Sequence, residues 1–192
     1  MEQFFPLLYF GPTEYYRRVA QSENSLWVVQ ERYSKQTLRN RCSIYGANGK
    51  IQLSIPVERT KGKEILLCDA VISYVEPWQQ IHWRSIKSAY GRTPYFEYFE
   101  HKFEALYSEE IQLLVDFLQK ANQIVLDILK VKAPDIYEGP IEVGIQKELD
   151  AQSEIGFYDS GKPYYQIFED RHGYIPNLSI LDWIFQCGPK IV

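Results

Sequence analysis

Two short segments carry most of the side chains that could bind or transform a small molecule. Residues 35–41 combine a lysine, two arginines and two side-chain amides, and residues 82–91 combine an imidazole, two cations and a tyrosine. Guanidinium groups bind phosphate and carboxylate bidentately, and an imidazole can move a proton near neutral pH. The two segments therefore predict a site for an anionic or sugar-type small molecule.

The first segment is expected to lead into a β-strand. Alternation along a strand would place Arg39 and Arg41 on one face and Asn40 on the other, so that both guanidiniums could hold one phosphate or carboxylate. Lys35 and Asn40 would then orient that ligand. The other interpretation is a solvated edge, or ion pairs with acidic residues elsewhere in the chain, and the local sequence leaves both open.

The second segment is expected to lie on a helix over residues 77–90. His82 falls on the apolar stripe of this helix, where it is a candidate general acid or base or, alternatively, a hydrogen-bonded core residue. Arg84 and Lys87 lie three residues apart and form a second cationic surface, which lines the same site or faces water. Tyr90 offers a flat ring for stacking on a sugar or base, although packing is the commoner use of tyrosine.

Length and composition predict one domain over residues 1–192, because 192 residues with 45% hydrophobic content suffice for one packed core. The net charge of −4 is unevenly distributed. Residues 1–96 carry 13 basic and 8 acidic residues, whereas residues 97–192 carry 8 and 17. A sequence pI near 5.5 and the acidic second half argue against a nucleic-acid groove.

The three cysteines form no CxxC pair and lie near no histidine at metal-ligand spacing, so we expect neither a metal site nor a disulfide framework. No familiar catalytic or nucleotide-binding motif occurs, and the sequence identifies no cofactor and no oligomeric state. No apolar run approaches the roughly 20 residues of a membrane span, and no secretory leader is recognisable. A cytoplasmic location is therefore expected.

The order of expected elements predicts an α/β fold with a β-α-β start, a mixed sheet and a helix-rich second half, compatible with a Rossmann-like layout. A ligand cleft is expected at the C-terminal ends of the early strands. Thr13 and Ser108 are expected to cap helices, and Asn48-Gly49 to form a hairpin turn. Strands are expected at 4–10, 25–30, 41–45, 51–57, 65–73, 141–145 and 164–168, and helices at 14–20, 77–90, after Pro94, at 109–130 and at 178–187.

Several sequence blocks, in order along the chain, resemble the WbqC-like protein family. They are Tyr15-Tyr16, Tyr33-x-Lys35-x-x-x-x-Asn40-Arg41-x-x-Ile44, Ile55-Pro56-Val57, His82-Trp83-Arg84-Ser85-Ile86, Pro94-Tyr95-Phe96 and Leu178-Ser179-Ile180-Leu181-Asp182. Residues 176–189 are similar to the family's C-terminal signature. The resemblance implies a presumptive site made of Tyr15, Lys35, Asn40, Arg41, His82, Asn177 and Asp182.

The resemblance also implies a role in bacterial surface-polysaccharide (O-antigen) biosynthesis, as a transferase that acts on an activated sugar by acyl or aminoacyl transfer. His82 and Lys35 would be the catalytic residues. Two departures bear on that role: Val29-Gln30 stands where many relatives have paired aspartates, and residues 135–162 shorten a longer region. The alternative is a non-catalytic ligand-binding or scaffold protein of the same family.

Overall fold

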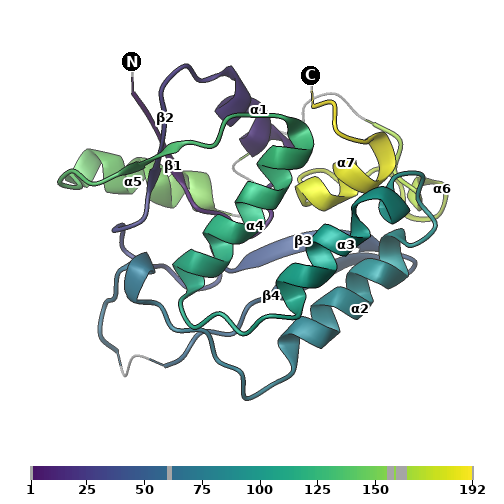
Figure 1. The fold of residues 1–192 in the computed structure, drawn as a ribbon, viewed down its shortest axis with the longest axis horizontal. Coiled ribbons are helices and arrows are strands. Elements are labelled where there is room, and N and C mark those ends of the chain that lie inside the picture. Colours follow the sequence, from purple (N-terminus) through teal and green to yellow (C-terminus); the bar gives the residue numbers. More distant parts are fainter. Residues whose placement is uncertain (1, 60–61, 155–157, 159–163, 192) are drawn as a thin grey trace.

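The computed structural model describes residues 2–59, 62–154, 158 and 164–191 (Figure 1). Its first sheet has three parallel strands in the order β1 (Gln3–Pro6), β2 (Ser25–Val28) and β5 (Asp135–Tyr137). Helix α1 (Thr13–Gln21) joins β1 to β2, so the predicted β-α-β start is confirmed. Strand β5, which the sequence did not predict, pairs with β2 on the other side.

The second sheet is the predicted hairpin of β3 (Arg41–Gly46) and β4 (Gly49–Ser54), which pair antiparallel. Gly49 has a φ of +104°, a conformation that glycine adopts without steric cost. The Asn48-Gly49 sequence therefore forms the turn that its residue types predict.

The rest of the fold is mainly helical. The remaining helices are α2 (Trp78–Tyr90), α3 (Phe96–Tyr107), α4 (Leu114–Leu129), α5 (Val143–Ser153), α6 (Glu169–His172) and α7 (Ile180–Cys187). Helix α4 crosses the centre of Figure 1, with α2 and α3 to one side and α5 to the other. The α/β class and the helix-rich second half are confirmed.

Two predicted caps are wrong. Helix α1 begins after Pro12, and no side chain caps it. Helix α4 begins only at Leu114, far beyond Ser108, because the preceding segment is extended: Ile72 N–H donates to the Gln112 carbonyl, and Leu114 N–H donates to the Ala70 carbonyl. The N–H of Ile111, which a cap at Ser108 could have bound, donates instead to the Tyr74 hydroxyl at 2.9 Å.

Three predicted strands are also wrong. Residues 65–73 form isolated bridges, interrupted by a short 3₁₀ turn at Leu67–Asp69. Val143 begins helix α5 where residues 141–145 were expected to be extended. The described residues 164–168 contain no strand, because the chain there turns into α6, with Glu169 N–H donating to the Gln166 carbonyl.

The expected cleft at the C-terminal ends of the early strands is filled by the chain's own side chains. Strand β1 stops at Pro6, and Leu7, Leu8, Tyr9 and Phe10 are fully buried. Phe10 lies in the left-handed region with a φ of +45°. The apolar run that predicted a long strand is thus a short strand followed by a buried bend, because periodicity alone cannot separate these two uses of a buried run.

Candidate functional site

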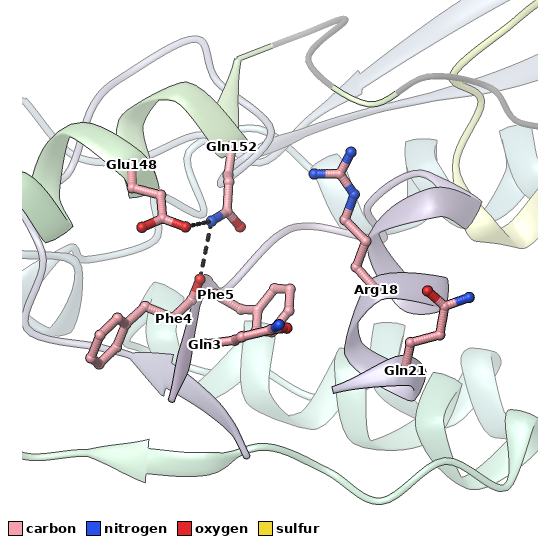
Figure 2. A pocket seen from close by; sticks show the side chains of 7 residues that line it. All are labelled: Gln3, Phe4, Phe5, Arg18, Gln21, Glu148 and Gln152. Atoms are coloured by element: carbon pink, nitrogen blue, oxygen red, sulfur yellow. Dashed lines mark hydrogen bonds between the residues drawn. The ribbon is translucent and has the colours of Figure 1, made fainter. Parts of the chain in front are cut away.

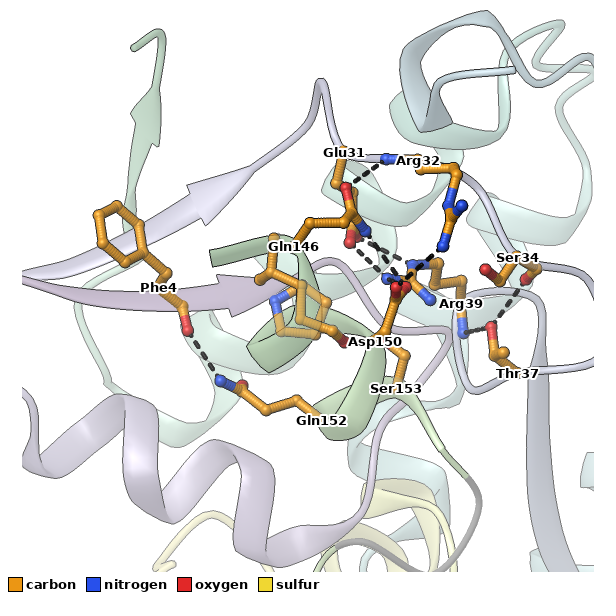
Figure 3. Close-up of polar contacts among 12 residues, drawn as sticks. Phe4, Glu31, Arg32, Ser34, Thr37, Arg39, Gln146, Asp150, Gln152 and Ser153 are labelled. Carbon is orange, nitrogen blue, oxygen red and sulfur yellow. Dashed lines mark hydrogen bonds and ion pairs between the residues drawn. The ribbon is translucent and has the colours of Figure 1, made fainter. Parts of the chain in front are cut away.

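Arg39 lies inside the protein in a network of ion pairs (Figure 3). Its side chain is 0% exposed. Its Nε donates to Glu31 Oε1 at 3.0 Å, its Nη2 donates to Asp150 Oδ1 at 3.1 Å, and a further ion pair joins Nη2 to Glu31 Oε2. Arg39 sits in a turn before β3, so the expectation that Arg39 and Arg41 share one strand face is corrected: the guanidinium of Arg39 is held by two carboxylates.

The electrostatics of this network explain its geometry. Glu31 is also fully buried, and burial raises the pKa of its carboxyl group, while the Arg39 guanidinium opposes that rise. A buried carboxylate is costly unless it is paired. Asp150 adds a second carboxylate from helix α5, and it also lies 3.5 Å from Arg32. The network therefore joins α5 to the segment between β2 and β3.

The other predicted residues of the first segment have different surroundings. Asn40 Nδ2 donates to the Ile55 carbonyl at 3.0 Å, which fixes the start of the hairpin. Arg41 is half-buried and pairs in register with Ser54. Lys35 is exposed in the turn that precedes them. The Asn40 amide is thus used by the fold, whereas Lys35 lies at the surface.

His82 is 4% exposed and packs inside the protein. Its Nδ1 lies 2.8 Å from the hydroxyl of Tyr9, which lies 2.5 Å from the hydroxyl of Tyr107. Burial lowers the pKa of His82 to about 4, partly opposed by the backbone of Ser54. The ring is therefore neutral at pH 7, and it lies near the end of β4, the strand that pairs with Arg41.

The remaining predicted cations of α2 lie at the surface. Arg84 is exposed. Lys87 Nζ lies 3.8 Å from Glu100 and 3.9 Å from Glu104 of α3, and it sits over the ring of Trp83. Lys87 thus helps to join α2 to α3.

Two predicted tyrosines are buried in hydrogen-bonding roles. The hydroxyl of Tyr15 donates to the Pro6 carbonyl at 2.9 Å and accepts from Trp27 Nε1 at 3.0 Å. The hydroxyl of Tyr90 accepts from the backbone N–H of Tyr45 at 3.0 Å. Both rings are fully buried, so neither presents a face for stacking in this structure.

The fold brings two predicted residues, Asp182 and Tyr90, together, and the Tyr164 hydroxyl donates to Asp182 Oδ2 at 2.7 Å. Burial raises the pKa of Asp182 to about 6, opposed by hydrogen bonds from Tyr164, Tyr90 and Gln186. Tyr164 also lines, with Asn177, a hollow of about 10 Å³ beside the start of α1. That volume suits about one water molecule, so this corner is too small for a sugar-type ligand.

A larger cavity lies between α1, the edge strand β1 and helix α5 (Figure 2). Its volume is about 460 Å³, within the range of small-molecule sites. The side chains of α5 and those of α1 form facing walls, with β1 between them. The lining residues are Gln3, Phe4, Phe5, Arg18, Gln21, Glu148 and Gln152.

Gln152 is the most fixed polar group of this cavity. Its side chain is buried; its Nε2 donates to the Phe4 carbonyl at 3.0 Å and to Glu148 Oε1 at 3.2 Å. Its Oε1 accepts from the Tyr158 hydroxyl at 3.4 Å. The Phe4 carbonyl belongs to the free edge of β1, so Gln152 ties α5 to that edge and orients the Glu148 carboxylate.

The opposite wall carries the cavity's positive charge. The guanidinium of Arg18 lies over the ring of Tyr158 at 5.2 Å, and its Nε is 3.8 Å from Glu14. Its side chain is 42% exposed, so water and ligands reach it. Gln21, three residues later on the same face of α1, adds an amide. The cavity thus joins a cation, a carboxylate and three amides beside Phe4 and Phe5 of β1.

None of these lining residues was predicted from the sequence. Arg18 and Gln21 are three residues apart, and Glu148 and Gln152 are four apart, so each pair lies on one face of its helix. This spacing was the signal in the sequence that could have indicated the cavity. It could not be used for the second pair, because α5 was not predicted as a helix. The burial of Gln152 and its bond to Phe4, 148 residues earlier in the chain, exist only in the folded protein.

Within the described residues, no group of three or more histidine, cysteine, aspartate or glutamate side chains is placed to hold a metal ion. Burial raises the pKa of Cys42 above its usual value, which keeps that thiol protonated. Among the helices in the described part of the chain, none has the length and apolar character to cross a membrane.

Comparison with known proteins identifies the chain at the level of its family. Comparisons with curated proteins and with solved structures gave no match. A family model described as the WbqC-like protein family matches residues 6–153, which covers four of the seven residues that line the cavity and ends before the segment 176–189. The chain belongs to the WbqC-like protein family.

Proposed function

We propose that this protein binds a sugar-type ligand with an anionic group in the cavity between β1, α1 and α5. The observation that carries the proposal is the composition of the cavity: one guanidinium, one carboxylate and three amides beside Phe4 and Phe5 of β1. Amides and carboxylates match sugar hydroxyls, and a guanidinium matches a phosphate or carboxylate.

The proposed biological context is surface-polysaccharide biosynthesis of the O-antigen type, with an activated sugar as the ligand. The proposed reaction is acyl or aminoacyl transfer to that sugar. Membership of the family supports the context. Among the seven lining residues, Glu148 has the one carboxylate, so a proton transfer within the cavity would use Glu148.

A second candidate function is non-catalytic ligand binding or scaffolding. Two observations favour it: the seven described residues that line the cavity include no histidine and no cysteine, and the predicted catalytic His82 is buried with a pKa lowered to about 4. The two candidates differ in one measurable outcome. A transferase forms product from an activated sugar and an acyl donor, whereas a binding protein gains thermal stability from the sugar and forms no product.

The test begins with thermal-shift and calorimetric titrations of the full chain against nucleotide sugars. We expect binding that Arg18→Gln weakens and that the matched surface variant Arg92→Gln leaves unchanged. Substitution of Gln152 by Leu should also weaken binding, because it removes the amide that orients Glu148. Binding that is equal in all three variants would place the ligand elsewhere, and the absence of any binding would overturn the proposal.

Turnover assays with acyl and aminoacyl donors then separate the two candidates. If His82 moves the proton, His82→Gln abolishes product formation and leaves ligand affinity unchanged. If Glu148 moves the proton, Glu148→Gln abolishes product formation instead. Turnover that survives both substitutions removes both residues from the catalytic step, and the absence of turnover in the wild type favours the binding protein.

A further inference from the structure

The cavity has opposite charges on its two facing walls. Glu148 and Gln152 project from α5 on one side, and Arg18 and Gln21 project from α1 on the other (Figure 2). The contacts described above hold both charged groups in place: Gln152 binds the carboxylate, and the Tyr158 ring packs against the guanidinium. A ligand that fills the cavity therefore meets a negative and a positive group on different sides.

This arrangement disfavours a ligand of one charge. A purely anionic sugar would gain from Arg18 but would be repelled by Glu148, and a purely cationic one would meet the reverse. Two unit charges a few ångströms apart interact by about 1 kcal/mol in water and more near a protein surface. An aliphatic amine is mostly protonated at pH 7, so a ligand with both an amine and an anion satisfies both walls.

We infer that the cavity selects ligands that carry a protonated amine and an anionic group on the same molecule, with the amine at Glu148 and the anion at Arg18. This inference rests on the proposed function of the cavity as a ligand site. An amino sugar phosphate and a free amino acid both have this chemistry. The exposed amides of Gln3 and Gln21 favour the amino sugar, because a free amino acid lacks the ring hydroxyls that they would bind.

The experiment uses isothermal titration of the full chain with five defined probes at one pH and ionic strength. The probes are glucosamine 1-phosphate, glucose 1-phosphate, N-acetylglucosamine 1-phosphate, glucosamine and glycine. We expect glucosamine 1-phosphate to bind about fivefold more tightly than either phosphate that lacks the free amine, as for one partly exposed ion pair. We expect weaker binding of glucosamine and of glycine.

Variants that remove one charge show how each wall of the cavity contributes to the preference for a ligand with a free amine. Glu148→Gln should bring the affinities of glucosamine 1-phosphate and glucose 1-phosphate together, whereas Glu138→Gln, an exposed carboxylate outside the cavity, should leave their ratio unchanged. Arg18→Gln should weaken both phosphates about equally, and Arg92→Gln should weaken neither. Far-ultraviolet circular dichroism and the melting temperature of each variant show whether it is folded.

The outcomes are distinguishable from those for the proposed function. If sugar phosphates bind with no preference for the amine, or if Glu148→Gln keeps that preference, the inference is overturned while the proposed binding function stands. If glycine binds more tightly than glucosamine 1-phosphate, the amino acid is the source of the shared chemistry and the amino-sugar assignment is overturned. If no probe and no nucleotide sugar binds, both proposals fail.

Discussion

At the residue scale, burial decides what a charged or titratable side chain does. Arg39 was predicted to bind an anionic ligand. In the structure it is buried and forms ion pairs with two carboxylates of the protein. His82 was predicted as a general acid or base. Its ring is buried beside the Tyr9 hydroxyl, and burial lowers its pKa. The sequence identifies such residue types correctly, but it cannot distinguish a solvent-facing arginine from a buried one.

The ion pair of Arg39 gives the first prediction. Arg39→Met should lower the free energy of unfolding by about 3–5 kcal/mol, because it leaves the buried Glu31 carboxylate without its partner. Urea unfolding monitored by fluorescence measures this loss. The double variant Arg39→Met with Glu31→Gln should recover part of it, and Arg92→Met serves as the exposed control. A loss equal to that of the control would contradict the role of the buried pair.

The opposite pKa shifts of His82 and Asp182 give the second prediction. The folded pKa of His82 is lowered to about 4, so its contribution to stability is present above pH 6.5 and is lost as the pH falls towards 4. The folded pKa of Asp182 is raised to about 6, so its contribution is present below pH 3.8 and is lost as the pH rises towards 6. The two contributions offset each other between pH 4 and 6.

Urea unfolding at several pH values tests this balance. Relative to the wild type, His82→Gln should lose stability as the pH rises from 4 to 6, and Asp182→Asn should gain it, each by about 3 kcal/mol. Measuring differences from the wild type removes the contributions of the other carboxyl groups. Parallel pH profiles for the three proteins would show that neither group titrates as described.

At the element scale, helix α5 is attached mainly by polar contacts. Of its residues, Leu149, Gln152 and Ser153 are buried. Asp150 binds Arg39, Gln152 binds the Phe4 carbonyl, and the Ser153 carbonyl accepts from the N–H of Leu38. Helix α5 covers the free edge of β1 and forms one wall of the cavity, so these contacts couple the buried ion pair to the shape of the proposed site.

The third prediction concerns this attachment. Asp150→Asn should lower the free energy of unfolding by about 1–3 kcal/mol, because it removes a charged partner of Arg39. Hydrogen exchange should accelerate in Val143–Ser153 and remain slow in Leu114–Leu129, since local opening follows local contacts. Asp135→Asn, at an exposed pair with Lys132, is the control. Equal acceleration in both helices would contradict an independent opening of α5.

The prediction of elements from the sequence succeeded where local chemistry alone sets the structure. The β3–β4 hairpin and the helices that became α2 and α7 were predicted because an Asn-Gly turn, an initial proline and a terminal glycine act over a few residues. The prediction from the sequence failed for β5 and α5. Strand β5 has three residues, and β2 is its hydrogen-bonding partner; α5 has a weakly apolar face, and its anchors are distant in sequence.

At the scale of the whole molecule, the basic first half and the acidic second half are joined by ion pairs. Arg32 and Arg39 pair with Asp150, and Lys87 lies near Glu100 and Glu104. Several cations that could have formed a basic surface are therefore partly neutralised within the protein. The uneven distribution of charge along the sequence therefore provides oppositely charged partners for ion pairs between distant segments.

The fourth prediction follows from this neutralisation. Single-stranded oligonucleotides should cause no shift in a mobility assay at physiological salt, because a backbone-binding groove requires a run of accessible cations. Fluorescence anisotropy at low salt provides a second measurement. Binding that falls steeply with salt concentration would contradict the prediction and would restore the basic half as a nucleic-acid surface.

The sequence by itself determined the α/β class, the family, the hairpin turn and the residue types available for chemistry, because these depend on local preferences and on motifs. The tertiary structure alone decided which of those residues meet solvent. It buried Arg39 and His82, filled the expected cleft with residues 7–10, and formed a cavity from residues of β1, α1 and α5. The physical reason is that exposure and charge pairing depend on contacts between segments that are distant in the sequence, such as Gln152 and Phe4, which are 148 residues apart.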